Sequence, residues 1–139
     1  MDLFLDEEVD EVATRKNVKK FFEKIFPRLI MLSELNTTQL QSPTLSDMPA
    51  SKPVGNSNEK KIINMIEAQR IVKEVIKSMK YVRGHGSTIL YDIYVLNIDN
   101  WKTANKIGYS KARYQDFKNQ ALLDFADTFM FEKDFHVYK

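Results

Sequence analysis

Residues 100–119, NWKTANKIGYSKARYQDFKN, have the pattern of two helices that meet at a tight turn. A helix-turn-helix needs a small residue on its first helix, where the second helix crosses it closely, and Ala104 meets that need. Further along, Gly108 supplies the positive φ that such a turn demands, at no steric cost. Ser110 can then cap the second helix through its hydroxyl. The stretch therefore predicts a helix-turn-helix.

The second helix of this pattern, expected over residues 111–129, has one apolar face. Tyr114, Phe117 and Ala121 recur at intervals of three or four residues, so they share one side of the helix and belong to a core. We also expect Trp101 to be buried, where it would cover the short helix that precedes it. The predicted scaffold of the motif comprises Trp101, Ala104, Ile107, Gly108, Tyr109, Tyr114 and Phe117.

The opposite face of this helix carries small and hydrogen-bonding side chains. Glutamine and asparagine can pair with adenine, arginine can pair with guanine, and alanine leaves room for the thymine methyl group. The predicted base-reading residues are Ser110, Lys111, Ala112, Arg113, Gln115, Asp116 and Asn119. The predicted phosphate contacts, which add affinity without sequence information, are Lys102, Lys106 and Lys118. A plain helical hairpin that turns at a glycine is the alternative interpretation.

Helical periodicity continues outward from this stretch. Apolar spacing predicts helices over residues 59–81 and 89–96, and an N-terminal helix over residues 6–35 that Pro27 should kink or restart. Residues 36–57 hold three of the four prolines and little that can anchor a core, which is typical of a flexible linker. The prediction is an all-α protein with an N-terminal helical arm (1–35), a flexible linker (36–57) and a four-helix C-terminal unit with a tail (58–139).

The composition limits the class of protein. The chain has 139 residues, 43% of them hydrophobic, which suffices for one core. It has no cysteine, which excludes disulfides, thiolate metal sites and thiol nucleophiles. No apolar run is long enough to span a bilayer, and the acidic N-terminus is unlike a secretory signal. We expect a soluble, cytoplasmic protein that is not an enzyme and that needs no metal and no cofactor.

The charge, +2 overall, is unevenly distributed along the chain. Acidic residues 6–11 precede a basic run from Arg15 to Arg28, and a second basic cluster from Lys102 to Lys118 contains Asp116 as its one acid. The tail turns acidic again. A concentrated basic segment flanked by acids is what a local nucleic-acid footprint produces, although a solvated helix face can have a similar pattern.

Three segments of the second half resemble a known family: ILYDIYVL (89–96), WKTANKIGYS (101–110) and YQDFKNQALLDFA (114–126). They are similar to the ArpU/RinA type of phage transcriptional regulators, which in turn resemble the promoter-reading region 4 of sigma factors. The resemblance spans about residues 58–129. It implies a DNA-binding activator of phage or prophage late genes, for packaging, structure and lysis, associated with the nucleoid of a Gram-positive host. It also implies that Lys111, Ala112, Gln115 and Asp116 face bases.

Two other functions remain open for such a chain. A sigma-like interaction module would dock on host RNA polymerase and touch DNA little, and a phage DNA-packaging recognition subunit would also use helices of this kind. The polar and basic outward face favours double-stranded DNA as the partner, because a purely protein-binding module would need an apolar patch there. Host RNA polymerase is a further candidate partner, a membrane is not, and a homodimer is compatible with the sequence.

Residues outside the motif are expected to be structural. His85 and His136 each lack a nearby second ligand, so we expect a turn residue and a tail residue rather than a metal or proton-transfer site. The late aromatic residues are expected to pack against the N-terminal helix or a partner rather than to stack on bases. They are Phe129, Phe131, Phe135 and Tyr138.

Overall fold

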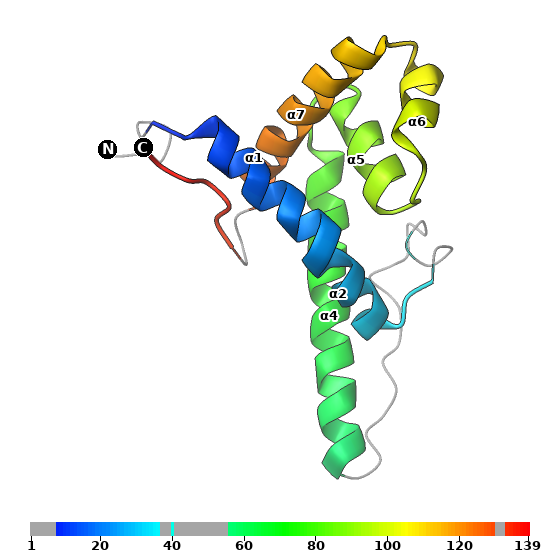
Figure 1. Ribbon diagram of the computed structural model, residues 1–139. Coiled ribbons are helices and arrows are strands. Elements are labelled where there is room, and N and C mark those ends of the chain that lie inside the picture. Colours follow the sequence, from blue (N-terminus) through cyan, green and yellow to red (C-terminus); the bar gives the residue numbers. More distant parts are fainter. Residues whose placement is uncertain (1–7, 37–39, 41–55, 130–132) are drawn as a thin grey trace.

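The computed structural model describes residues 8–36, 40, 56–129 and 133–139, and the elements that the chain forms in these ranges are helices (Figure 1). The predicted all-α class is therefore confirmed. The elements are α1 (Glu11–Lys20), the π-helical turn η2 (Phe21–Ile25), α2 (Phe26–Ser33), α4 (Asn56–Lys80), α5 (Gly86–Tyr94), α6 (Asn100–Ile107) and α7 (Lys111–Thr128). Most of the predicted linker, residues 37–39 and 41–55, lies outside the described ranges.

Pro27 interrupts the N-terminal helix, as the sequence predicts. Proline has no backbone N–H to donate to the carbonyl of Glu23, and the helix widens into η2, in which the N–H of Phe26 donates to the carbonyl of Phe21. α2 then begins with the proline in its first turn. The side chains of Phe21, Phe22 and Phe26 all remain buried across this change of helix type.

The main core is a cluster of phenylalanine rings that both ends of the chain supply. The ring centroid of Phe21 lies 5.1 Å from that of Phe135, and Phe22 lies 4.7 Å from Phe125. Aliphatic residues of α4 and α5 complete this cluster. The segment predicted to be an N-terminal arm therefore shares one hydrophobic core with α4, α5 and α7.

At Gly86, helix α5 begins close to both α7 and the turn that follows α4. A Cβ at this position would lie 2.7 Å from Cγ1 of Val82 and 3.0 Å from Cβ of Ala121, closer than side chains normally approach. The absence of a side chain at Gly86 therefore lets the helices meet. α5, α6 and α7 gather at the C-terminal end of α4, whereas α2 lies beside the middle of α4 (Figure 1).

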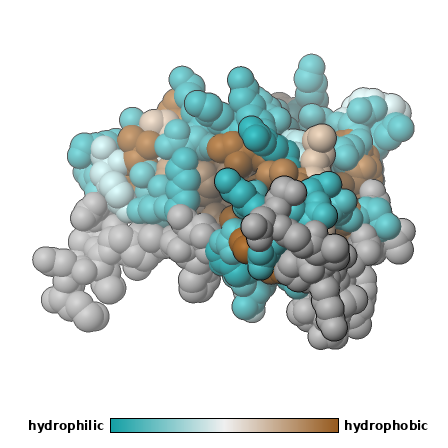
Figure 2. Space-filling view, turned by 90° about the horizontal axis from the view of Figure 1, so that it is seen from below, coloured by the Kyte–Doolittle hydropathy of each residue, from teal (hydrophilic) through white to brown (hydrophobic). Residues whose placement is uncertain are grey.

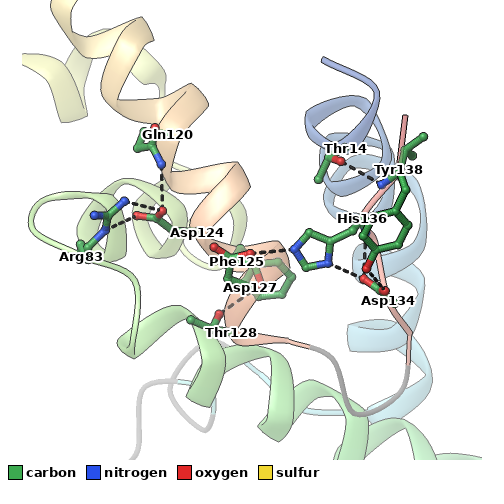
Figure 3. A network of polar contacts seen from close by, with 11 residues as sticks. Thr14, Arg83, Gln120, Asp124, Phe125, Asp127, Thr128, Asp134, His136 and Tyr138 are labelled. Atoms are coloured by element: carbon green, nitrogen blue, oxygen red, sulfur yellow. Dashed lines mark hydrogen bonds and ion pairs between the residues drawn. The ribbon is translucent and has the colours of Figure 1, made fainter. Parts of the chain in front are cut away.

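The C-terminal residues 133–139 lie beside α1 (Figure 3). The N–H of Asp10 donates to the carbonyl of Val137 at 2.7 Å, and the N–H of Val137 donates to Oγ1 of Thr14 at 3.0 Å. Phe129 and Phe135 pack against Phe21, which confirms the expected packing of these two late aromatics on the N-terminal helix. Phe131 lies outside the described residues.

His136 joins the tail to α7 by contacting one carboxylate on each, Asp127 of α7 and Asp134 of the tail (Figure 3). Its Nε2 lies 2.7 Å from Oδ1 of Asp127, and its Nδ1 contacts Asp134. Burial opposes the charged form, but the hydrogen bonds to Asp127 and Asp134 outweigh it and raise the pKa of His136 above its ordinary value. The expected tail histidine is thus a buried, ion-paired one.

The surface seen from below is mainly hydrophilic, with hydrophobic groups between the polar ones (Figure 2). Large apolar side chains that remain exposed in the described residues include Met31, Leu32, Ile63, Ile66 and Trp101. None of the described helices combines the length and the apolar character that crossing a membrane requires.

Candidate nucleic-acid interface

The turn between α6 and α7 has the local features that the sequence predicts. Gly108 adopts a φ of 79°, and its N–H donates to the carbonyl of Asn105 at 3.2 Å. The N–H of Tyr109 reaches back to the carbonyl of Ala104 at 3.0 Å, so the last carbonyls of α6 find donors. Oγ of Ser110 accepts from the N–H of Arg113 at 3.3 Å and caps α7.

A second, smaller core holds α5, α6 and α7 together. Its buried members are Ile89, Ala104 and Tyr114, one from each helix. The rings of Tyr109 and Phe117 stack beside it with their centroids 4.6 Å apart and their planes at 11°. Partly buried residues that complete the cluster are Ile93, Ile107, Tyr109 and Phe117. Phe117, predicted as a core residue, is therefore only half-buried.

Two buried residues, Asp92 of α5 and Tyr114 of α7, set the position of α6 through their polar groups. The carboxylate of Asp92 on α5 is buried and accepts from Oγ1 of Thr103 at 3.3 Å and from Nζ of Lys106 at 2.9 Å. At the other end, Oδ1 of Asn100 accepts from the hydroxyl of Tyr114 at 2.7 Å. Burial, helped by the nearby Asp92, raises the pKa of Tyr114 to about 12, so this hydroxyl stays protonated and donates. These bonds fasten α6 to α5 and to α7.

Trp101 contradicts its prediction, because 63% of its surface is exposed. The buried side chains of α6 are Thr103 and Ala104, and Trp101, three residues before Ala104, lies at the edge of that buried face, open to solvent. Nζ of Lys102 lies 5.5 Å from the centroid of the indole ring. Tryptophan and lysine thus stand together at the surface where α6 begins.

Lys118 also contradicts its prediction, because a phosphate contact needs an ammonium group at the surface and this residue is only 8% exposed. Its Nζ donates to Oδ1 of Asn100 at 3.0 Å and lies 5.8 Å from the ring centroid of Tyr94. Burial lowers the pKa of Lys118, Lys19 adds to that effect, and Glu23 opposes it. Lys118 is therefore a buried structural residue.

The other two predicted phosphate contacts differ from each other. Lys102 is exposed. Lys106 is also exposed along its stem, but its ammonium is paired with the buried Asp92. Of the three lysines, Lys102 alone presents a surface charge that the described residues do not neutralise by an ion pair.

The predicted base-reading residues share the surface of the first turns of α7. Ser110, Lys111, Ala112, Arg113, Gln115 and Asp116 are exposed, and Asn119 is half-buried. Nε2 of Gln115 donates to Oδ1 of Asn119 at 3.1 Å. The guanidinium of Arg113 lies over the rings of Tyr109 and Phe117, at 5.6 and 5.4 Å from their centroids. These contacts order the two long polar side chains of this surface.

A groove of about 640 Å³ separates the start of α6 from the start of α7. Trp101 and Asn105 line one side, and Lys111 and Gln115 line the other. The sequence-based prediction missed this groove because it placed Trp101 inside the core. Within the described residues, no three histidine, aspartate or glutamate side chains gather as metal ligands.

Comparison with known proteins gives one informative similarity. No family model matches the chain, and no solved structure matches it. The sequence is 27% identical, over 124 residues, to a protein of Enterococcus hirae that is provisionally named autolysin regulatory protein ArpU. The matched region covers 88% of this chain and 90% of that relative, so the two proteins are similar over nearly their whole lengths.

Proposed function

We propose that this chain is a sequence-specific DNA-binding transcriptional regulator of the ArpU type, and that α6, the Gly108 turn and α7 act as a helix-turn-helix like that of sigma region 4. The observation that carries the proposal is the polar, exposed surface at the start of α7, next to a turn with left-handed Gly108 and a Ser110 cap. The smaller core shared by α5, α6 and α7 holds that surface in place, together with the hydrogen bonds that Asp92 and Asn100 accept. A preorganised polar helix end is what base reading needs.

In this proposal the start of α7 enters the major groove. Gln115 and Asn119 offer amide groups to adenine, Arg113 offers its guanidinium to guanine, and Ala112 leaves room for a thymine methyl group. Lys111, Asp116 and Ser110 border the same surface. On binding, the hydrogen bond between Gln115 and Asn119 and the stacking of Arg113 on Tyr109 and Phe117 would be exchanged for contacts with base edges.

The phosphate contacts are revised from the sequence-based prediction. Lys102 keeps its role, Lys118 loses it because it is buried, and Lys106 contributes little because Asp92 holds its charge. Trp101 joins the interface, since it lies beside Lys102 and across the groove from Lys111. An indole N–H can donate to a phosphate oxygen while the ring covers the sugar.

The name of the relative and the family resemblance support a proposal for the regulated genes. The Enterococcus hirae protein is provisionally named as an autolysin regulatory protein. We propose, from the family resemblance, that this chain activates lysis and packaging genes of a phage or prophage, in the bacterial cytoplasm.

The first test is selection of a bound sequence from a random duplex pool by the full chain, followed by titration of that duplex and a scrambled one. Gln115→Ala should cost about 1–3 kcal/mol of binding free energy at the selected site and change scrambled-duplex binding little. Asn64→Ala, an exposed amide on α4, is the matched control and should bind like the wild type. Equal losses on both duplexes, or none on either, would refute base reading by Gln115.

Docking on RNA polymerase is the second candidate function, and the exposure of Trp101 favours it. A tryptophan with 63% of its surface exposed beside a groove is a common anchor for a protein partner. In that case no duplex would bind in a salt-dependent way, and Trp101→Ala would abolish binding to purified polymerase. Retained polymerase binding by Trp101→Ala would remove this candidate.

A further inference from the structure

The longest helix, α4, carries a row of exposed residues on the side away from the core. Glu59, Ile63, Ile66 and Arg70 follow one another at spacings of four, three and four residues, so they form one stripe along the helix. The buried residues of α4 lie on the opposite side: Met65, Ala68, Gln69, Val72, Val75, Ile76, Ser78 and Met79. The stripe is therefore an outer face of α4.

The middle of the stripe is apolar and its two ends are charged. Ile63 is 58% exposed and Ile66 is 43% exposed, although both are large aliphatic side chains. Glu59 and Arg70 are exposed at the two ends. Arg70 is bonded to Glu67 on the same helix, and both side chains remain about half-exposed, so the guanidinium stays at the surface.

The spacing of the stripe is that of the a and d positions of a coiled coil. Consider two such helices that lie antiparallel, related by a two-fold axis that passes between Asn64 and Met65. Each stripe residue on one side of this axis then meets the residue of the second copy that lies equally far along the sequence on the other side of it. Ile63 then faces Ile66 of the second copy, and Glu59 faces Arg70 of the second copy. The apolar contact and the ion pair each occur twice, as an isologous interface requires.

We propose that this stripe is a homodimerisation surface on which two copies of the chain pair their α4 helices antiparallel. A parallel pair is excluded by charge, because it would place Glu59 against Glu59 and Arg70 against Arg70. This self-complementarity identifies the occupant as a second copy of this chain. The proposal does not depend on DNA binding, because α6 and α7 contribute nothing to the stripe.

The test is sedimentation equilibrium of the full chain without DNA, for the wild type and two charge reversals. The wild type should show a reversible monomer–dimer equilibrium at micromolar to millimolar concentrations. Glu59→Arg and Arg70→Glu should each weaken self-association by about tenfold or more, because two attractions become two repulsions. Circular dichroism melting checks that each variant is folded.

Mixing the two reversed variants is the decisive measurement. Glu59→Arg pairs with Arg70→Glu through two restored attractions, so the mixture should form a heterodimer at concentrations at which each variant alone stays mainly monomeric. The double variant should dimerise like the wild type. A variant in which the first turns of α4 had unfolded would not associate in the mixture either, so this result separates a charge effect from a loss of structure.

Two variants on the same helix serve as controls. Lys77→Glu lies on the same face but beyond the paired segment, and Glu67→Gln removes the partner of Arg70 within the chain; both should dimerise. A wild type that stays monomeric, charge reversals without effect, or a mixture that does not associate would each overturn the proposal.

Discussion

Phe117 and Phe125 lie on the same helix, yet their rings have different surroundings. Phe125 is fully buried among the phenylalanines of the main core. Phe117 is half-buried, with one side stacked on Tyr109 and the guanidinium of Arg113 over the ring. A side chain that water already reaches leaves a smaller cavity when it is removed.

Replacing these two rings should therefore have unequal effects on stability. Phe125→Ala should lower the free energy of unfolding by about 3–5 kcal/mol, and Phe117→Ala by about half as much. Urea denaturation of both variants measures the difference. Equal losses would show that the ring of Phe117 is as enclosed as that of Phe125.

Variants of two lysines, Lys102 and Lys118, test which of them contacts phosphate and which supports the fold. In duplex binding, Lys102→Ala should reduce the slope of log affinity against log salt by about 1, because one counterion fewer is released. Lys118→Met should leave that slope unchanged and should instead lower the melting temperature, since Asn100 loses a donor. A smaller slope for Lys118→Met would place its ammonium on the phosphates after all.

At the scale of the elements, the junction of α5, α7 and the turn that follows α4 depends on Gly86. Gly86→Ala should lower the free energy of unfolding by about 1–3 kcal/mol, because the new methyl group would overlap Cγ1 of Val82. Adding Val82→Ala removes that atom, so the double variant should lose less stability than the two single losses together predict. Thermal melting of the three variants decides, and strict additivity would show that the two residues do not touch.

At the scale of the whole molecule, the tail is fastened by His136 between Asp127 and Asp134. The pKa of His136 is higher in the folded chain than in the unfolded one, so the folded state holds this proton more tightly. The stabilisation is fully present below the unfolded pKa of about 6.5 and is lost as the pH rises through the folded value.

The free energy of unfolding should therefore decline from slightly acidic to mildly alkaline pH in the wild type. His136→Gln should be less stable at low pH and should lack this decline, because glutamine does not titrate. Urea denaturation at a series of pH values compares the two proteins. Parallel profiles would show that the ion pairs of His136 contribute no pH-dependent stability.

The local features of this protein followed from its sequence. The start of α7 at Lys111, the positive φ of Gly108, the cap at Ser110 and the break at Pro27 were all predicted and are all present. Each depends on backbone bonds and side chains within a few positions of one another, and such short-range chemistry can be read directly from neighbouring residues.

Only the tertiary structure decided which faces of those helices are covered. Trp101 and Lys118 lie on helices that the sequence placed correctly, yet the first is exposed and the second is buried. Helical periodicity fixes the relative directions of side chains along one helix but does not identify the element that packs on them. Lys118 lies beneath Tyr94 and near Lys19, residues far from it in sequence, and Trp101 has no such cover among the described residues. Burial depends on contacts between distant segments of the chain. For this reason Lys118, which the local pattern placed at the surface, is buried, and Trp101, which it placed in the core, is exposed.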